Sequence, residues 1–220
     1  ANRNFYYITG ITQERSAIVI KKENGRILKM TLYIKAYDHT SVRWNGKTLS
    51  SSQAAKISKI YDVSFTESFE SELRKLLKGW KGTISIDKDA LNVSEGWFMG
   101  FLNDYFPDND IIDIYPLMSD LRMIKSDYEI EMIKTAARYA DKGIRQMYKN
   151  ATEGMYEYEL AADFAHVLAK SGLGAPAFDS IVAAGENFNY LHYPQLDGKI
   201  AGNDLILVDV GASFNGLNSD

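Results

Sequence analysis

The stretch LILVDVGASFNGLNSD, residues 205–220, constrains the fold more than any other part of the sequence. It begins with a continuous apolar run, which is typical of a β-strand buried on both faces. The dipeptide Asn215-Gly216 favours a two-residue type I′ turn. The segment therefore predicts a buried strand that continues into a tight hairpin.

The hairpin register predicts that two carboxylates share one face of the sheet. A turn at residues 215–216 pairs Phe214 with Leu217 and, further along, Gly211 with Asp220. Because side chains alternate between faces, Asp209 lies on the same face as Asp220. The two become diagonal cross-strand neighbours, with Cβ atoms roughly 7–8 Å apart or a little less. Gly211 is expected to leave space between them.

Two carboxylates that converge on a buried face predict a metal site. Their burial is costly unless a positive charge lies between them. A pair of divalent cations about 3.5–4 Å apart would fit that opening. Oxygen ligands favour an ion such as manganese over thiolate-bound zinc. Aspartates near hairpins are common, however, so Asp220 as a solvated turn residue remains an open alternative.

Composition excludes several classes of protein. The chain has no cysteine, which rules out disulfide scaffolds, thiolate zinc sites and cysteine nucleophiles. A net charge of -4 argues against nucleic acid as a partner. No apolar run is long enough to cross a membrane and no signal peptide is visible. We expect a cytoplasmic protein, although the absence of cysteine would also suit an exported one. The sequence begins without Met, and we expect that its native N-terminus is missing.

Turn signals and periodicity in the first half predict strands alternating with helices. Asn24-Gly25 predicts a hairpin between SAIVIKK and RILKMTLYIKA. FYYITG is rich in β-formers, and the polar stretch YDHTSVRWNGKTLSSS is expected to be a loop. Helices are expected at 52–58, at 69–77 and in GWFMGFLNDYF, and strands in TISID and DIIDIYPLM.

The second half opens with the clearest helix signal. Ser126 and Glu129 form a capping box, and apolar residues then recur at helical spacing. The predicted buried stripe comprises Ile130, Ile133, Ala137, Ala140, Ile144 and Met147. A second helix is expected at 156–170, and FDSIVAAG is expected to be a strand. The fold class is α+β, with domains at 1–120 and 121–220.

Four blocks of the second half carry a family resemblance. They are SDLRMIKSDYEIEMIKTAA, EGMYEYELAADF, AFDSIVAAGENFNYLHY and LILVDVGASFNGLNSD. In this order they resemble the first part of the catalytic domain of the pita-bread metallopeptidases. RNFYYITGITQERSAIVI and TLYIKAYDHTSVRWNGKTLS resemble the N-terminal domain of Xaa-Pro aminopeptidases in that family. The resemblance implies a creatinase-like α/β domain followed by an incomplete pita-bread domain, so that the chain is truncated within it.

The resemblance also implies a metal centre. The family uses two Asp, one His and two Glu as ligands of two divalent ions, for which we expect manganese, with zinc or cobalt as alternatives. Asp209 and Asp220 match the two aspartates, of which Asp209 would chelate one ion and Asp220 would bridge both. His192 matches a histidine beside the metals that binds substrate or stabilises the tetrahedral intermediate. The other ligands fall beyond residue 220, so we expect the 220-residue chain alone to be inactive.

The implied activity is the release of an N-terminal residue that precedes proline from proline-containing peptides. A loop tryptophan such as Trp44 is commonly a packing anchor, but in a homo-oligomer it could reach the active site of a neighbouring subunit. On the bare sequence, His192 is more commonly a core or surface histidine. An Xaa-Pro dipeptidase, a metal-free creatinase-like enzyme and a non-catalytic pita-bread domain that binds peptides or proteins remain alternatives.

Overall fold

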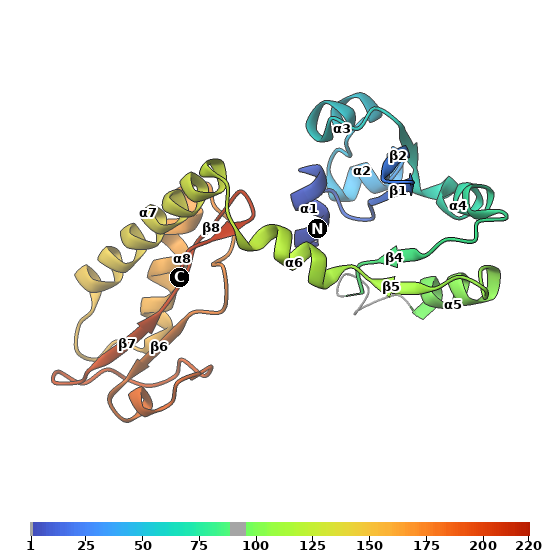
Figure 1. Cartoon of the computed structure of the whole chain (residues 1–220). Helices are drawn as coiled ribbons and strands as arrows, with labels where there is room; N and C mark the ends of the chain where they lie inside the picture. Colours follow the sequence, from blue (N-terminus) through green and yellow to red (C-terminus); the bar gives the residue numbers. More distant parts are fainter. Residues whose placement is uncertain (1, 89–95) are drawn as a thin grey trace. The chain divides into compact units, whose positions relative to one another are not determined.

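The computed structural model describes residues 2–88 and 96–220. Contacts divide the chain into two compact units, Ala1–Met123 and Ile124–Asp220 (Figure 1). The domain ranges inferred from the sequence, 1–120 and 121–220, stay a prediction. In the described part of the chain, no helix is long and apolar enough to cross a membrane.

The first unit combines short helices with a three-stranded sheet and a two-stranded sheet, whose arrangement Figure 1 shows. Its elements are α1 (Arg3–Thr9), β1 (Ala17–Glu23), β2 (Arg26–Ile34), α2 (His39–Asn45), α3 (Ser51–Ser58), β3 (Val63–Phe65), the 3-10 helix η1 (Thr66–Ser68), α4 (Phe69–Leu77), β4 (Ile84–Ile86), α5 (Gly96–Tyr105), β5 (Ile111–Asp113) and α6 (Tyr115–Met123). Strand β2 pairs antiparallel with β1 and parallel with β3, and β4 pairs parallel with β5.

Local signals located several of these elements correctly. Asn24 and Gly25 both have positive φ, at 49° and 78°, as a type I′ turn requires between β1 and β2. The predicted helices in residues 52–58 and 69–77 are confirmed as α3 and α4, and TISID contains β4. The segment DIIDIYPLM forms β5 only at its start, because its last residues enter α6.

Two predictions in the first unit are wrong. FYYITG is not extended but belongs to helix α1, because the Asn2 side chain accepts hydrogen bonds from the Asn4 and Phe5 amides and Gly10 ends the helix. The expected polar loop contains helix α2. The side chain of Asp38 accepts from the Thr40 amide there, and such a cap overrides weak helix propensity.

The second unit packs two long helices with short antiparallel strands. Its elements are α7 (Asp127–Asn150), α8 (Glu157–Lys170), β6 (Ile181–Ala184), the 3-10 helix η2 (Gly185–Asn189), β7 (Ile206–Asp209), β8 (Ser213–Phe214) and β9 (Leu217–Asn218). The Ser126–Glu129 capping box is confirmed at the start of α7. Helix α8 contacts both α7 and β6, and the core there includes Phe164, Leu168 and Val182, all at 0% exposure.

The buried face of α7 differs from the predicted stripe. The residues buried on it are Ala136, Ala140, Gly143 and Met147. Ala140 and Met147 were predicted, but Ile130 and Ile144 are 38% and 44% exposed. Small residues on the buried face let the two helix backbones approach closely, whereas isoleucines would hold them apart.

The prediction that the run before Asp209 is buried on both faces is also wrong. Leu205 is 71% exposed and Val208 is 38% exposed. In the described chain, β7 has one ladder partner, β6, and Ile206 is the residue of β7 that packs against the core cluster. An apolar run therefore identified the strand correctly but not its surroundings.

Candidate functional site

The C-terminal hairpin forms with the predicted register. Phe214 pairs with Leu217 and Ser213 with Asn218, across a turn in which Asn215 and Gly216 have φ of 49° and 77°. Beyond the ladder, the Ser219 amide donates to the Ala212 carbonyl at 2.9 Å. This register carries the chain from the end of β7 back to Asp220.

Gly211 does not leave the expected open space. A Cβ atom there would overlap the Ser219 carbonyl oxygen and would lie 2.5 Å from Cε1 of Phe178. The Gly211 carbonyl also accepts a hydrogen bond from the Ala177 amide. Glycine is required here because neighbouring atoms fill the position of a side chain, not because a ligand does.

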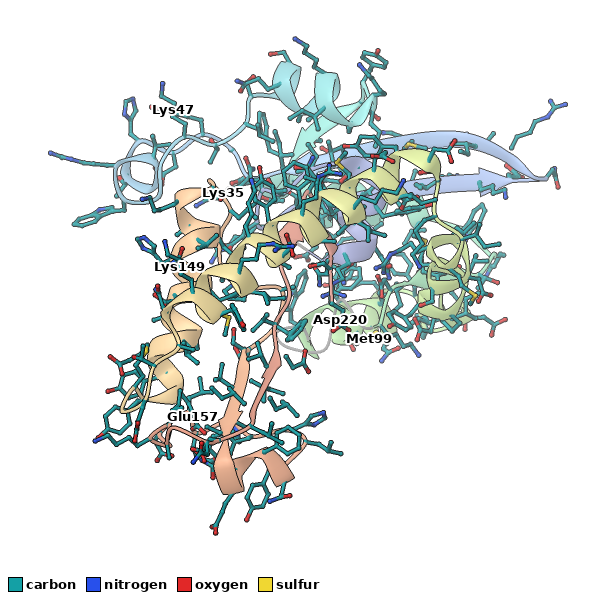
Figure 2. All side chains as sticks on the ribbon, turned by 90° about the vertical axis from the view of Figure 1, so that its left-hand side faces the viewer. Lys35, Lys47, Met99, Lys149, Glu157 and Asp220 are labelled. Atoms are coloured by element: carbon teal, nitrogen blue, oxygen red, sulfur yellow. The ribbon has the colours of Figure 1, made fainter. Side chains whose placement is uncertain are left out.

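The two candidate metal ligands occupy the ends of this segment. Asp209 is the last residue of β7, opposite Ile181, and is half-buried, whereas Asp220 is exposed after Ser219 (Figure 2). In the part of the chain that the structure describes, no hydrogen bond or ion pair holds either carboxylate. A partly buried carboxylate without a partner has the chemistry of a cation ligand, because a bound cation would offset the cost of burying its charge.

These residues do not by themselves make a complete metal site. Across residues 2–88 and 96–220, no group of three or more His, Cys, Asp or Glu side chains is arranged to hold a metal ion. Two carboxylates supply oxygen donors of the right type for manganese but fewer than a divalent ion takes in protein sites. The roles of Asp209 and Asp220 as metal ligands therefore stay a prediction.

His192 lies on an exposed loop. The chain leaves β6 at Ala184, passes through η2 and reaches His192, which is exposed and followed by the buried Tyr193. Ala184 pairs with Ile206, at the other end of the ladder from Asp209. No hydrogen-bond partner of the His192 side chain occurs among the described residues, so its imidazole is free to meet a ligand.

A buried polar network, which the sequence did not reveal, lies beside this loop. Its centre is Glu157, the first residue of α8, at 0% exposure. The Tyr193 hydroxyl donates to Asp197 at 2.8 Å and accepts from Asn187 at 3.0 Å. Burial, the hydrogen bond to Asp197 and the proximity of Glu157 raise the pKa of Tyr193 to about 12. A glutamate in the first turn of a helix is so common that the sequence carries no distinct signal.

Trp44 belongs to the other unit, on α2. Its side chain is 82% exposed, so it is not a packing anchor of the described chain. A large aromatic side chain in water is available for contact with a ligand or another chain.

Comparison with known families gives a match for each half of the chain. Residues 131–220 match the model of metallopeptidase family M24, and residues 1–85 match the N-terminal domain of aminopeptidase P. The chain has the predicted fold class, an aminopeptidase P N-terminal domain followed by part of an M24 metallopeptidase domain.

Several relatives of this chain are proline peptidases by name. The chain is 27% identical to Xaa-Pro aminopeptidase of Haemophilus influenzae over 96% of this chain and 48% of the relative. It is 29% identical to Xaa-Pro dipeptidase of Pyrococcus furiosus over 99% of this chain and 56% of the relative. A solved structure from Bacillus anthracis, assigned to aminopeptidase P, has a TM-score of 0.90 and 35% identity, over 100% of this chain and 54% of that one. The chain spans about half the length of the relatives it matches.

Proposed function

We propose that the full-length protein is a metal-dependent aminopeptidase that releases an N-terminal residue preceding proline. The observation that carries the proposal is the half-buried, unpartnered Asp209 at the end of β7, joined by a confirmed hairpin register to Asp220 within the M24 match. The 220-residue chain alone is expected to be inactive, because the described residues supply too few metal ligands.

Asp209 and Asp220 would hold two divalent ions, with manganese as the expected metal. Bound ions supply an activated water and polarise a carbonyl. His192, exposed and without a partner, would donate a hydrogen bond to the oxyanion that develops on the substrate. Trp44 would contact short peptides across a homo-oligomer interface, because its side chain projects into solvent on α2.

The substrate class follows from the chemistry of proline and from the relatives. A proline nitrogen carries no N–H and its ring fixes φ, so a peptidase for this bond needs a dedicated pocket. A relative named Xaa-Pro aminopeptidase and another named Xaa-Pro dipeptidase both align over nearly the whole chain. The dipeptidase is the second candidate, and a non-catalytic peptide-binding protein is the third.

The test compares metal content and peptidase rate in the full-length protein. Asp209→Asn and Asp220→Asn should each reduce bound manganese and lower kcat/KM for Xaa-Pro peptides by roughly 100-fold, because the metals supply several kcal/mol of transition-state stabilisation. Asp141→Asn is the matched control, since Asp141 forms an exposed ion pair with Arg145 on α7.

Outcomes separate the candidates. Hydrolysis of tripeptides and longer Xaa-Pro peptides supports the aminopeptidase, whereas cleavage of dipeptides alone supports the dipeptidase. Peptide binding without hydrolysis in a manganese-loaded protein supports the non-catalytic alternative. Manganese content that is equal in the wild type and in both aspartate variants would exclude the proposed metal site.

A further inference from the structure

Glu157 is a fully buried carboxylate that accepts hydrogen bonds from three donors in two segments of the chain. Its Oε1 accepts from the Ala184 amide at 2.7 Å and from Asn187 Nδ2 at 3.0 Å. Its Oε2 accepts from the Gly198 amide at 2.7 Å. Burying a charged carboxylate is unfavourable unless such donors replace water, so all three donors must be held at hydrogen-bonding distance.

Backbone hydrogen bonds also join the start of α8 to residues 196–198. The Glu157 amide donates to the Gly198 carbonyl at 3.0 Å, and the Tyr158 amide donates to the Leu196 carbonyl at 2.9 Å. A Cβ atom on Gly198 would lie 2.7 Å from Oε1 of Glu157, so the segment lies directly against the carboxylate. The start of α8 therefore fixes both the end of β6 and the segment that follows Tyr193 (Figure 2).

The network also joins the two ends of the loop that carries His192. Asn187 precedes residues 188–192 and Tyr193 follows them. Asn187 Nδ2 donates to both Glu157 and the Tyr193 hydroxyl, and that hydroxyl donates to Asp197. Glu157 is thus hydrogen bonded directly to one end of the loop, and through Asn187 to the other.

Between these fixed ends the loop turns outwards. Tyr190 is 62% exposed, Leu191 is 80% exposed, and His192 is exposed as well. The Tyr190 amide donates to the Asn187 carbonyl at 3.0 Å, which closes a turn at the start of the loop. A loop with fixed ends and a solvated middle presents its side chains in a restricted range of orientations.

We propose that Glu157 is a positioning residue for His192, holding both ends of loop 188–192 so that the imidazole faces the substrate in one orientation. This inference rests on the proposed function, in which His192 contacts the substrate. Glu157 itself is fully buried, so it would act through the loop and not by contact with a substrate. A carboxylate is needed because both of its oxygens face N–H donors, and the amide nitrogen of a glutamine would face one of them without accepting from it.

A double-mutant cycle in the full-length protein tests the inference. Glu157→Gln should lower kcat by about 10–100-fold, as loss of an orienting partner does, with bound manganese unchanged. In the His192→Ala background the same substitution should have no further effect on kcat, because a residue that acts through His192 has nothing left to orient. Glu159→Gln is the matched control, since Glu159 is exposed in the same helical turn and a glutamine side-chain oxygen can also accept the hydrogen bond from the Tyr156 amide.

Hydrogen exchange gives a readout that does not depend on activity. Amides of residues 188–192 should exchange faster in Glu157→Gln than in the wild type or Glu159→Gln, while those of α7 remain unchanged. If Glu157→Gln does not fold, Tyr193→Phe opens the network at the other end of the loop and should show the same two effects.

The results separate this inference from the proposed function. A wild type that binds manganese but cleaves no Xaa-Pro peptide would overturn the proposed function, and the exchange measurement would still decide the role of Glu157. The positioning role would be overturned if Glu157→Gln lowered kcat by the same factor in the wild-type and His192→Ala backgrounds. It would also be overturned if Glu157→Gln left amide hydrogen exchange in residues 188–192 unchanged.

Discussion

Gly143 of α7 lies directly against the aromatic ring of Phe164 in α8. A Cβ atom at Gly143 would lie 2.7 Å from Cε2 of Phe164, and Phe164 is 0% exposed. The ring cannot move into solvent, and the two helix backbones are held at a distance that only glycine permits. This contact sets the packing of the second unit.

Gly143→Ala is therefore expected to destabilise the protein, although alanine is the better helix former. Overpacking costs about 1–3 kcal/mol, which exceeds the gain in helix propensity of up to about 1 kcal/mol. The free energy of unfolding, measured by urea denaturation, should fall by about 1 kcal/mol. Gly100→Ala in α5 is the control, because a Cβ there meets nothing within 4 Å, and it should stabilise slightly. Equal stabilisation by both substitutions would contradict the close packing.

The same contact explains which part of the fold could be predicted from the sequence. Ser126 with Glu129, Asn24-Gly25 and Asn215-Gly216 act over a few residues, and each predicted its cap or turn correctly. The buried face of α7 depends on how closely another helix approaches. That distance is set by Gly143 and Phe164 together, which periodicity within one helix does not encode.

The errors of the sequence-based prediction, in the fold and in the site, also separate local from long-range effects. Helix α1 was not predicted because its interior is rich in residues that favour strands. Only two single residues, the N-cap Asn2 and the C-cap Gly10, indicate the helix. The register of the C-terminal hairpin was predictable because it depends on one turn. The burial of Glu157 was not, because its donors at Ala184 and Gly198 come from segments distant in the sequence.

The raised pKa of Tyr193 predicts that the folded protein loses stability in alkaline solution. The pKa of this tyrosine is raised from 10.0 to about 12 in the folded protein, so the folded state resists an ionisation that the unfolded state undergoes readily. The resulting stabilisation is fully present below pH 10 and is lost as pH rises from about 10 to about 12. Tyr193→Phe should show a smaller decrease in unfolding free energy over this interval. Parallel curves for the two proteins would argue against the buried hydroxyl.

Substitution of the exposed Trp44 is expected to weaken substrate binding without changing stability. Because its side chain is 82% exposed, Trp44→Ala should change the unfolding free energy by less than about 0.5 kcal/mol. In the full-length protein the same substitution should raise KM for short Xaa-Pro peptides. Tyr148→Ala is the matched control, as Tyr148 is 87% exposed on α7. An unchanged KM in Trp44→Ala would remove Trp44 from the proposed site.

If Asp220 binds metal, metal affinity should depend on the β8–β9 turn that contains Gly216. Its φ of 77° is strained for any residue with a Cβ, so Gly216→Ala should destabilise the β8–β9 turn by about 1–2 kcal/mol. Asp220 lies two residues after the end of β9, so its position depends on that turn. Manganese affinity of the full-length protein, measured by calorimetry, should therefore fall in Gly216→Ala. It should be unchanged in Gly174→Ala, where an added Cβ meets nothing within 4 Å. Unaltered affinity in both variants would mean that Asp220 reaches the metal independently of the hairpin, or does not bind it.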